Sequence, residues 1–162
     1  MLQKSQELPK AKILELFSDT PEPVSTNLLS KGRFRHFLSG EVLFCFGDLA
    51  KEVFLLTHGR VKITQVTKNG EEVVLRLDSP GDLVGPLGMH LAGTHNSTAQ
   101  AIEESQALVW DVNTFKDALN RSPILERNTQ HFLERRISEL EQRFCEVATA
   151  KASSRLAQHG RV

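Results

Sequence analysis

Six histidines and two cysteines are the side chains of this 162-residue chain best suited to hold a metal ion. Cys45 and Cys145 lie far apart in the sequence and neither belongs to a C-x-x-C pair. Two such cysteines cannot form the disulfide framework of a small secreted protein, and they do not supply a zinc site. The spacing therefore predicts free thiols in a reducing, cytoplasmic location.

The chain also lacks the motifs of common enzymes. Residues 86–90 (PLGMH) resemble the second metal-binding motif of the cupin enzymes. The first motif needs a His-x-His pair and a glutamate, whereas His58 stands alone before Gly59. A catalytic metal needs about three convergent ligands, and no G-x-S-x-G, P-loop or dinucleotide fingerprint is present. We expect a protein that is not an enzyme, with a cupin-like metal enzyme as the rival class.

Short runs of β-branched and aromatic residues occupy the middle of the chain and predict an antiparallel β-structure. The runs cover residues 41–47, 53–56, 59–66 and 72–77, and a further strand pair is expected at 97–102 and 106–112. Asn69-Gly70 between two of them predicts a hairpin with a type I′ turn. The expected fold class is α+β, mainly β: a β-roll or jelly roll flanked by short helices.

Helical patterns flank these strands. A helix is expected at 10–17, ended by Pro21 and Pro23, and a second near 25–30. A short helix capped by Asn113 or Thr114 follows the strands, and Ser122-Pro123 begins a long helix. The predicted organisation is an N-terminal helical segment at 1–33, a β-roll effector domain at 34–122 and a long dimerisation and interdomain helix at 123–158.

An apolar stripe on the long helix predicts self-association. Its residues recur at alternating spacings of four and three, which is the a/d rhythm of a coiled coil. They are Leu133, Ile137, Leu140, Phe144 and Val147. We expect these side chains to form the interface of a homodimer, the alternative being a stripe packed on its own domain.

The charges of the chain balance, with 20 Lys+Arg against 20 Asp+Glu. Non-specific nucleic-acid or membrane binding depends on excess positive charge, so this balance disfavours both. The N-terminus lacks the apolar core of a signal peptide, and no apolar run is long enough to span a membrane. A cytoplasmic protein without a membrane partner is expected.

Four segments together resemble the cyclic-nucleotide-binding β-roll of bacterial Crp/Fnr transcription regulators. They are residues 40–48 (GEVLFCFGD), 53–62 (VFLLTHGRVK), 69–75 (NGEEVVL) and 79–85 (SPGDLVG). The helix that ends in 147–157 (VATAKASSRLA) resembles the dimerisation helix of the same family. The resemblance implies an effector-binding domain of a transcription regulator. In this family a winged helix-turn-helix follows, and it is absent from this chain, so DNA contact is expected only through a C-terminal domain outside it.

The resemblance also implies a phosphate-binding cassette after Gly85, with backbone N–H groups at a helix N-terminus facing the anion. Members that bind cyclic nucleotides carry a glutamate and an arginine there. Matched without gaps, Pro86 stands at the glutamate position and Asn96 at the arginine position. Because both charged contacts are missing, we expect that neither cAMP nor cGMP is the effector.

The expected effector pocket combines this segment with the long helix, and the effector itself is unknown. Its residues are Gly85, Leu87, Gly88, Met89, His90, Asn96, Ser97, Thr98, Arg135 and Arg136. A haem-sensing alternative would use His90 or His95 as the axial ligand, with haem as cofactor. A redox alternative would use Cys145, while Cys45 is expected to be a buried, inert thiol.

Overall fold

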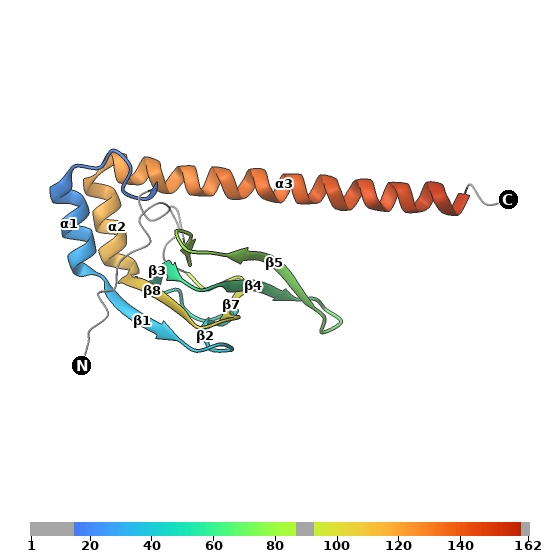
Figure 1. Cartoon of the computed structure of the whole chain (residues 1–162), viewed down its shortest axis with the longest axis horizontal. Coiled ribbons are helices and arrows are strands. Elements are labelled where there is room, and N and C mark those ends of the chain that lie inside the picture. The colour runs from blue at the N-terminus through green and yellow to red at the C-terminus, as the bar shows by residue number, and fades with distance from the viewer. Residues whose placement is uncertain (1–14, 87–92, 160–162) are drawn as a thin grey trace. The chain divides into compact units, whose positions relative to one another are not determined.

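The computed structural model describes residues 15–86 and 93–159 (Figure 1). The chain divides into two compact units, Met1–Thr129 and Gln130–Val162, which are described separately. The first unit contains the β-structure and the flanking helices. The second contains most of the long C-terminal helix.

The described strands form two four-stranded antiparallel sheets, which confirms the predicted β-roll class. The strand order is β1-β8-β3-β6 in one sheet and β2-β7-β4-β5 in the other. The strand bounds are β1 Arg33–Phe37, β2 Val42–Phe44, β3 Glu52–His58, β4 Val61–Val66, β5 Glu72–Asp78, β6 Leu83–Val84, β7 Thr98–Ala101 and β8 Ser105–Asp111. Residues 97–102 and 106–112 are both strands, as predicted, but they do not pair with each other: β7 lies between β2 and β4, and β8 lies between β1 and β3.

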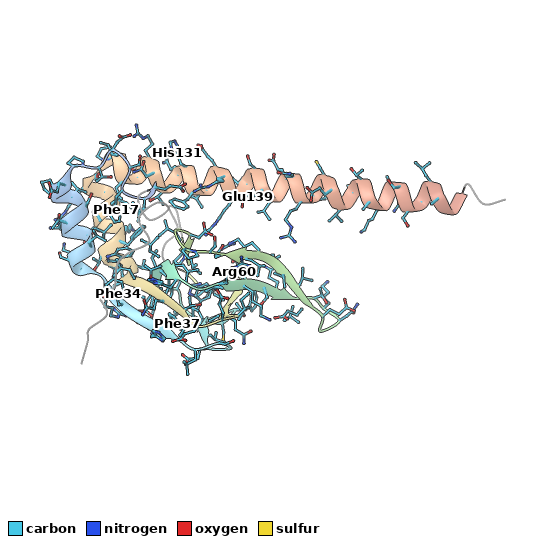
Figure 2. All side chains as sticks on the ribbon, viewed as in Figure 1. Phe17, Phe34, Phe37, Arg60, His131 and Glu139 are labelled. Carbon is cyan, nitrogen blue, oxygen red and sulfur yellow. The ribbon has the colours of Figure 1, made fainter. Side chains whose placement is uncertain are left out.

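Apolar residues on alternate strand positions form the core between the sheets. Phe54 and Leu56 of β3 and Val61 and Ile63 of β4 are buried there. Figure 2 labels Phe34 and Phe37 on β1, where the first is exposed and the second buried, because residues three positions apart on a strand point to opposite faces.

The outer face of the β1-β8-β3-β6 sheet is also buried at its central strands, where Val53, Leu55, Leu108 and Trp110 are at most 2% exposed. Helices α1 (Glu22–Lys31) and α2 (Val112–Arg121) lie side by side at one end of the sandwich (Figure 1). Trp110 of β8 is fully buried, and its indole N–H donates to the Leu28 carbonyl of α1 at 2.7 Å. This bond satisfies the polar atom of a large core side chain.

The helix boundaries correct two details of the sequence analysis and leave a third untested. The predicted helix at 10–17 lies mostly outside the described residues. The second helix is longer than predicted and begins directly after Pro21. Pro23 lies in its first turn, where a backbone N–H has no partner within the helix, so the missing N–H of a proline costs nothing. Asp111, not Asn113 or Thr114, is the N-cap residue of α2, because β8 runs directly into the helix.

The β4–β5 hairpin is present, but its turn is not type I′. The Thr67 N–H donates to the Glu71 carbonyl at 2.8 Å and the Gly70 N–H donates to the Thr67 carbonyl at 2.9 Å. Gly70 has a φ of +81°, whereas Asn69 is not among the described residues with positive φ. A type I′ turn needs positive φ at both central residues, so this is a three-residue loop that ends in a left-handed glycine.

Gly59, in the turn between β3 and β4, has no room for a side chain. Its φ is +88°, and a Cβ there would lie 2.5 Å from the Glu104 carbonyl oxygen and 2.7 Å from the Ser105 Cα. We expect Gly59→Ala to lower the free energy of unfolding by about 2–4 kcal/mol. Gly70→Ala is the control, since nothing lies within 4 Å of the position that its methyl group would take and only the backbone cost of about 1 kcal/mol applies. Equal losses of stability in urea unfolding would contradict the steric argument.

Helix α3 spans Pro123–His159 and begins at the proline that the sequence analysis placed in its first turn. The part within the first unit is anchored by Asn128, whose side-chain amide donates to the carbonyls of Leu16 at 2.9 Å and Ser18 at 2.7 Å. In the second unit, side chains project from α3 along its described length, with His131 and Glu139 labelled (Figure 2).

Candidate functional site

A cavity of about 340 Å³ opens in the β-sandwich beside the segment that resembles a phosphate-binding cassette. Its walls come from β2, the turn that follows β2, the first residues of β3 and the end of the cassette. The described lining residues are Leu43, Phe44, Asp48, Leu49, Lys51, Glu52, Phe54 and His95. The lining thus combines an apolar floor with four titratable side chains.

The turn after β2 is closed by hydrogen bonds between Cys45 and Asp48. The Cys45 N–H donates to the Asp48 carboxylate at 3.0 Å, and the Asp48 N–H donates to the Cys45 carbonyl at 3.1 Å. Because β2 ends at Phe44, Cys45 belongs to this turn and is exposed, so the expectation of a buried thiol was wrong. Gly47 takes a φ of +87° within the same turn.

The end of the cassette pairs with this turn like a short strand. The Gly47 N–H donates to the His95 carbonyl at 2.8 Å, and the His95 N–H donates to the Asp48 carbonyl at 2.8 Å. The Ala50 N–H donates to the Gly93 carbonyl at 2.7 Å. Three backbone bonds therefore fix the position of His95 at the cavity wall.

The His95 imidazole stacks on the Phe44 ring, with ring centroids 3.6 Å apart and planes inclined by 6°. Only 8% of the residue is exposed. Burial lowers the pKa of His95, and the nearby Asp48 charge opposes this effect only partly. The imidazole is therefore held in its neutral form near pH 7, which suits a hydrogen-bonding or stacking role.

This burial predicts a pH dependence of stability. Since the pKa of His95 is lower in the folded state, the unfolded state binds more protons below the ordinary imidazole pKa of about 6.5. The contribution of neutral His95 to the free energy of unfolding is complete above about pH 6.5. It is lost on acidification, by at most about 1.4 kcal/mol per pH unit for one proton. His95→Gln should flatten the decline between about pH 7.5 and 5.5 in thermal unfolding, whereas His58→Gln, at an exposed position, should not. If the stability of wild type and of His95→Gln declined equally over this pH range, burial of His95 would not be the cause of the decline.

An ion-pair cluster borders the cavity on the side of β3. Glu52 accepts hydrogen bonds from Arg33 and from Arg35, the latter at 3.0 Å. The Arg35 guanidinium also lies 5.1 Å from the centroid of the Phe37 ring and 5.8 Å from that of Phe54. Glu52 is thus compensated by two arginines of β1 and is oriented by them.

The predicted pocket residues of the β-roll fall into three groups according to their position in the structure. Leu87, Gly88, Met89 and His90 lie outside the described residues. Gly85 follows β6 with a φ of +118°, and a Cβ there would lie 3.0 Å from the Glu52 carbonyl oxygen. Asn96, Ser97 and Thr98 lie where the cassette runs into β7; the Asn96 carbonyl accepts from the Gln65 side chain at 2.7 Å, and the Thr98 hydroxyl accepts from the Phe46 N–H at 3.0 Å.

The remaining predicted residues lie on α3 in the second unit. The Arg135 guanidinium lies 4.9 Å from the centroid of the Phe132 ring, and Arg136 is half-buried. The apolar stripe is exposed at Ile137, Leu140, Phe144 and Val147, and half-buried at Leu133. Cys145 is exposed as well.

The described part of the chain contains no group of three or more His, Cys, Asp or Glu side chains placed to hold a metal ion. No helix within 15–86 and 93–159 combines the length and the apolar character needed to cross a bilayer.

Residues 34–122 match the Cyclic nucleotide-binding domain family, which is more than half of the chain. The chain belongs to this family. The cavity described above lies within this cyclic nucleotide-binding domain.

Relatives of this cyclic nucleotide-binding domain include bacterial regulators. The chain is 27% identical over 137 residues to the Cyclic AMP receptor protein of Thermus thermophilus, covering 85% of this chain and 63% of that protein. It is 28% identical over 120 residues to the Fumarate and nitrate reduction regulatory protein of Escherichia coli, covering 73% of this chain and 47% of that protein. The crystal structure of the Thermus thermophilus Catabolite Activator Protein superposes with a TM-score of 0.70 at 25% identity, over 83% of this chain and 63% of that chain. The chain thus spans only about half to two-thirds of the length of these relatives.

Proposed function

We propose that this chain is the effector-sensing and dimerising part of a Crp/Fnr-like transcription regulator whose effector is neither cAMP nor cGMP. Family membership and the similarity to bacterial regulators support the regulatory role. In this proposal a small molecule binds in the cavity that borders His95 and the end of the cassette. The protein is proposed not to be an enzyme. DNA is contacted through a C-terminal domain outside the 162 residues.

The observation that carries the proposal is the pair of residues at the two charged positions of the cassette. Pro86 offers neither a carboxylate for a ribose hydroxyl nor a backbone N–H for an anion. Asn96 is exposed, and its side chain carries no charge to pair with a cyclic phosphate. The loss of two charge-assisted contacts removes the basis for tight cyclic-nucleotide binding.

The exposed stripe on α3 supports the dimer. Phe144 is 74% exposed and Leu140 is 53% exposed in the single chain. Apolar residues at heptad spacing on a long helix are buried when a second helix packs against them. A second copy of the same helix would present the same stripe and complete the seam.

Signalling in this proposal follows from differential affinity. An effector that binds one arrangement of the paired helices more tightly than another shifts the population towards it. The change is then passed to the DNA-contacting domain beyond the end of α3. The cavity and the helix pair are thus coupled sites of one regulator.

Thermal unfolding in the presence of cyclic nucleotide tests the effector assignment. A ligand at 100 times its dissociation constant stabilises the folded state by about 2.7 kcal/mol, which would raise the midpoint by about 5–10 °C for a chain of this size. We expect about 1 mM cAMP or cGMP to change the midpoint by less than about 1 °C. A rise of several degrees would show that the cavity accepts these nucleotides and would contradict the proposal.

A further inference from the structure

Charged residues of opposite sign flank the apolar stripe of α3 on its two sides. The stripe fixes the heptad positions of the helix, with Ile137 at position a and Leu140 at position d. Positions g and e then lie on either side of the stripe. The charged residues there are Arg136 and Arg143 at g, and Glu134 and Glu141 at e. One edge of the stripe is therefore basic and the other is acidic.

These two edges favour one orientation of a second copy of the helix. In an antiparallel pair the two basic edges face each other and so do the two acidic edges, which is unfavourable. In a parallel pair each position g faces position e of the other helix, five residues further along. Arg136 then faces Glu141 of the partner subunit, and the charges attract.

The stripe offers a single kind of opposite-charge pair in this parallel arrangement. Within residues 133–147, all of which the structure describes, the other charged edge residues meet uncharged ones. The position five residues after Arg143 is Ala148, and the position five residues before Glu134 is Thr129. Two-fold symmetry repeats the pair made by Arg136, so one such pair lies on each side of the stripe.

The apolar stripe is too short to select a partner well by itself. The a and d positions beyond it are polar, with Gln130 before the stripe and Lys151 and Ser154 after it. About two heptads of apolar residues can pack against many helices that carry a similar stripe, whereas the charges at e and g discriminate between partners. The flanking charges therefore carry much of the information about which helix pairs with α3.

We propose that Arg136 and Glu141 select the dimerisation partner of this chain, through two symmetric ion pairs between the arginine of one copy and the glutamate of the other. The partner is a second copy of this chain, because it presents both the same stripe and the charges that complete both pairs. Arg136 then belongs to the interface and not to the effector pocket expected from the sequence. This inference rests on the proposed dimer and adds the residues that determine partner choice.

The first test mixes two charge-reversed variants, Arg136→Glu and Glu141→Arg. Alone, each variant brings two like-charge contacts into its dimer, so its dissociation constant should rise at least about tenfold. Mixed in equal amounts well above these constants, the variants restore both pairs, and about nine in ten dimers in native mass spectra should contain one chain of each. Effects of the substitutions within one helix cancel, because mixed and unmixed dimers contain the same chains. A statistical share of about half mixed dimers would overturn the inference.

The second test uses the charge-swapped chain Arg136→Glu/Glu141→Arg. It should form dimers with itself as tightly as the wild type, and it should pair with the wild type in clearly less than the statistical half. The matched control mixes Arg135→Glu with Glu139→Arg, which reverse the same charges at heptad positions f and c, away from the stripe. We expect the control to give the statistical share. An equal preference in the control would assign the effect to overall charge and overturn the inference.

The two levels of the proposal fail in different ways. A wild-type chain that stays monomeric would contradict the proposed dimer itself. A dimeric wild type whose charge-reversed variants mix at random would contradict only the role of Arg136 and Glu141.

Discussion

Leu140→Asp should convert the proposed dimer into a monomer. Leu140 lies in the middle of the exposed stripe of α3, and two-fold pairing would bury one introduced carboxylate from each chain at the seam. We expect the dissociation constant to rise by at least about 10³-fold, which corresponds to about 4 kcal/mol. Sedimentation velocity should then give the single-chain mass of 18.1 kDa for the variant and about twice that mass for the wild type.

Ser138→Asp is the matched control, because it adds the same carboxylate to the same helix between the stripe positions Ile137 and Leu140. In a heptad helix this position faces solvent, so the variant should remain a dimer. Dissociation of both variants would indicate loss of helix stability instead of loss of the seam. A dimeric Leu140→Asp protein would place the interface elsewhere.

Pro86→Glu combined with Asn96→Arg should create affinity for cAMP. The two substitutions restore the carboxylate and the guanidinium that the family resemblance places in the cassette. Each hydrogen bond to a charged group contributes about 1.5–3 kcal/mol, so the pair should tighten binding by at least about 10²-fold. Isothermal titration calorimetry with cAMP measures this gain.

Pro86→Gln combined with Asn96→Gln is the neutral counterpart of that variant. It removes the same proline and lengthens both side chains without adding charge, so it should not gain affinity for cAMP. An equal gain in both double variants would mean that the proline, and not the missing charges, prevents binding. No gain in the charged variant would mean that other residues of the pocket exclude the nucleotide.

Local patterns in the sequence were sufficient for most of the fold. The alternation through Val61 and Ile63 predicts one buried face of β4, and Asn69-Gly70 predicts the hairpin that follows it. The partners of β7 and β8 were not predictable in the same way. Strand pairing in a sandwich joins segments far apart in sequence, so proximity in the chain suggested a hairpin where the strands belong to different sheets.

The candidate site was harder to predict from the sequence, because its walls come from segments that are far apart in the chain. His95 was considered as a haem ligand, whereas its buried stacking on Phe44 depends on a turn and a cassette end that meet only in the fold. The pairing of Glu52 with two arginines of β1 likewise has no local signature. The composition predicts a strand over 41–47, which would include Cys45, whereas β2 ends at Phe44 and leaves Cys45 exposed in the following turn.

We propose that this cyclic nucleotide-binding domain does not use a cyclic nucleotide as its effector. Calorimetric titration of cAMP into the unmodified chain tests it most directly, since the heat of binding needs no label and no assumption about stability. The account predicts no saturable heat up to about 1 mM cAMP, which limits any binding free energy to about 4 kcal/mol. A saturable isotherm with a micromolar dissociation constant would contradict it.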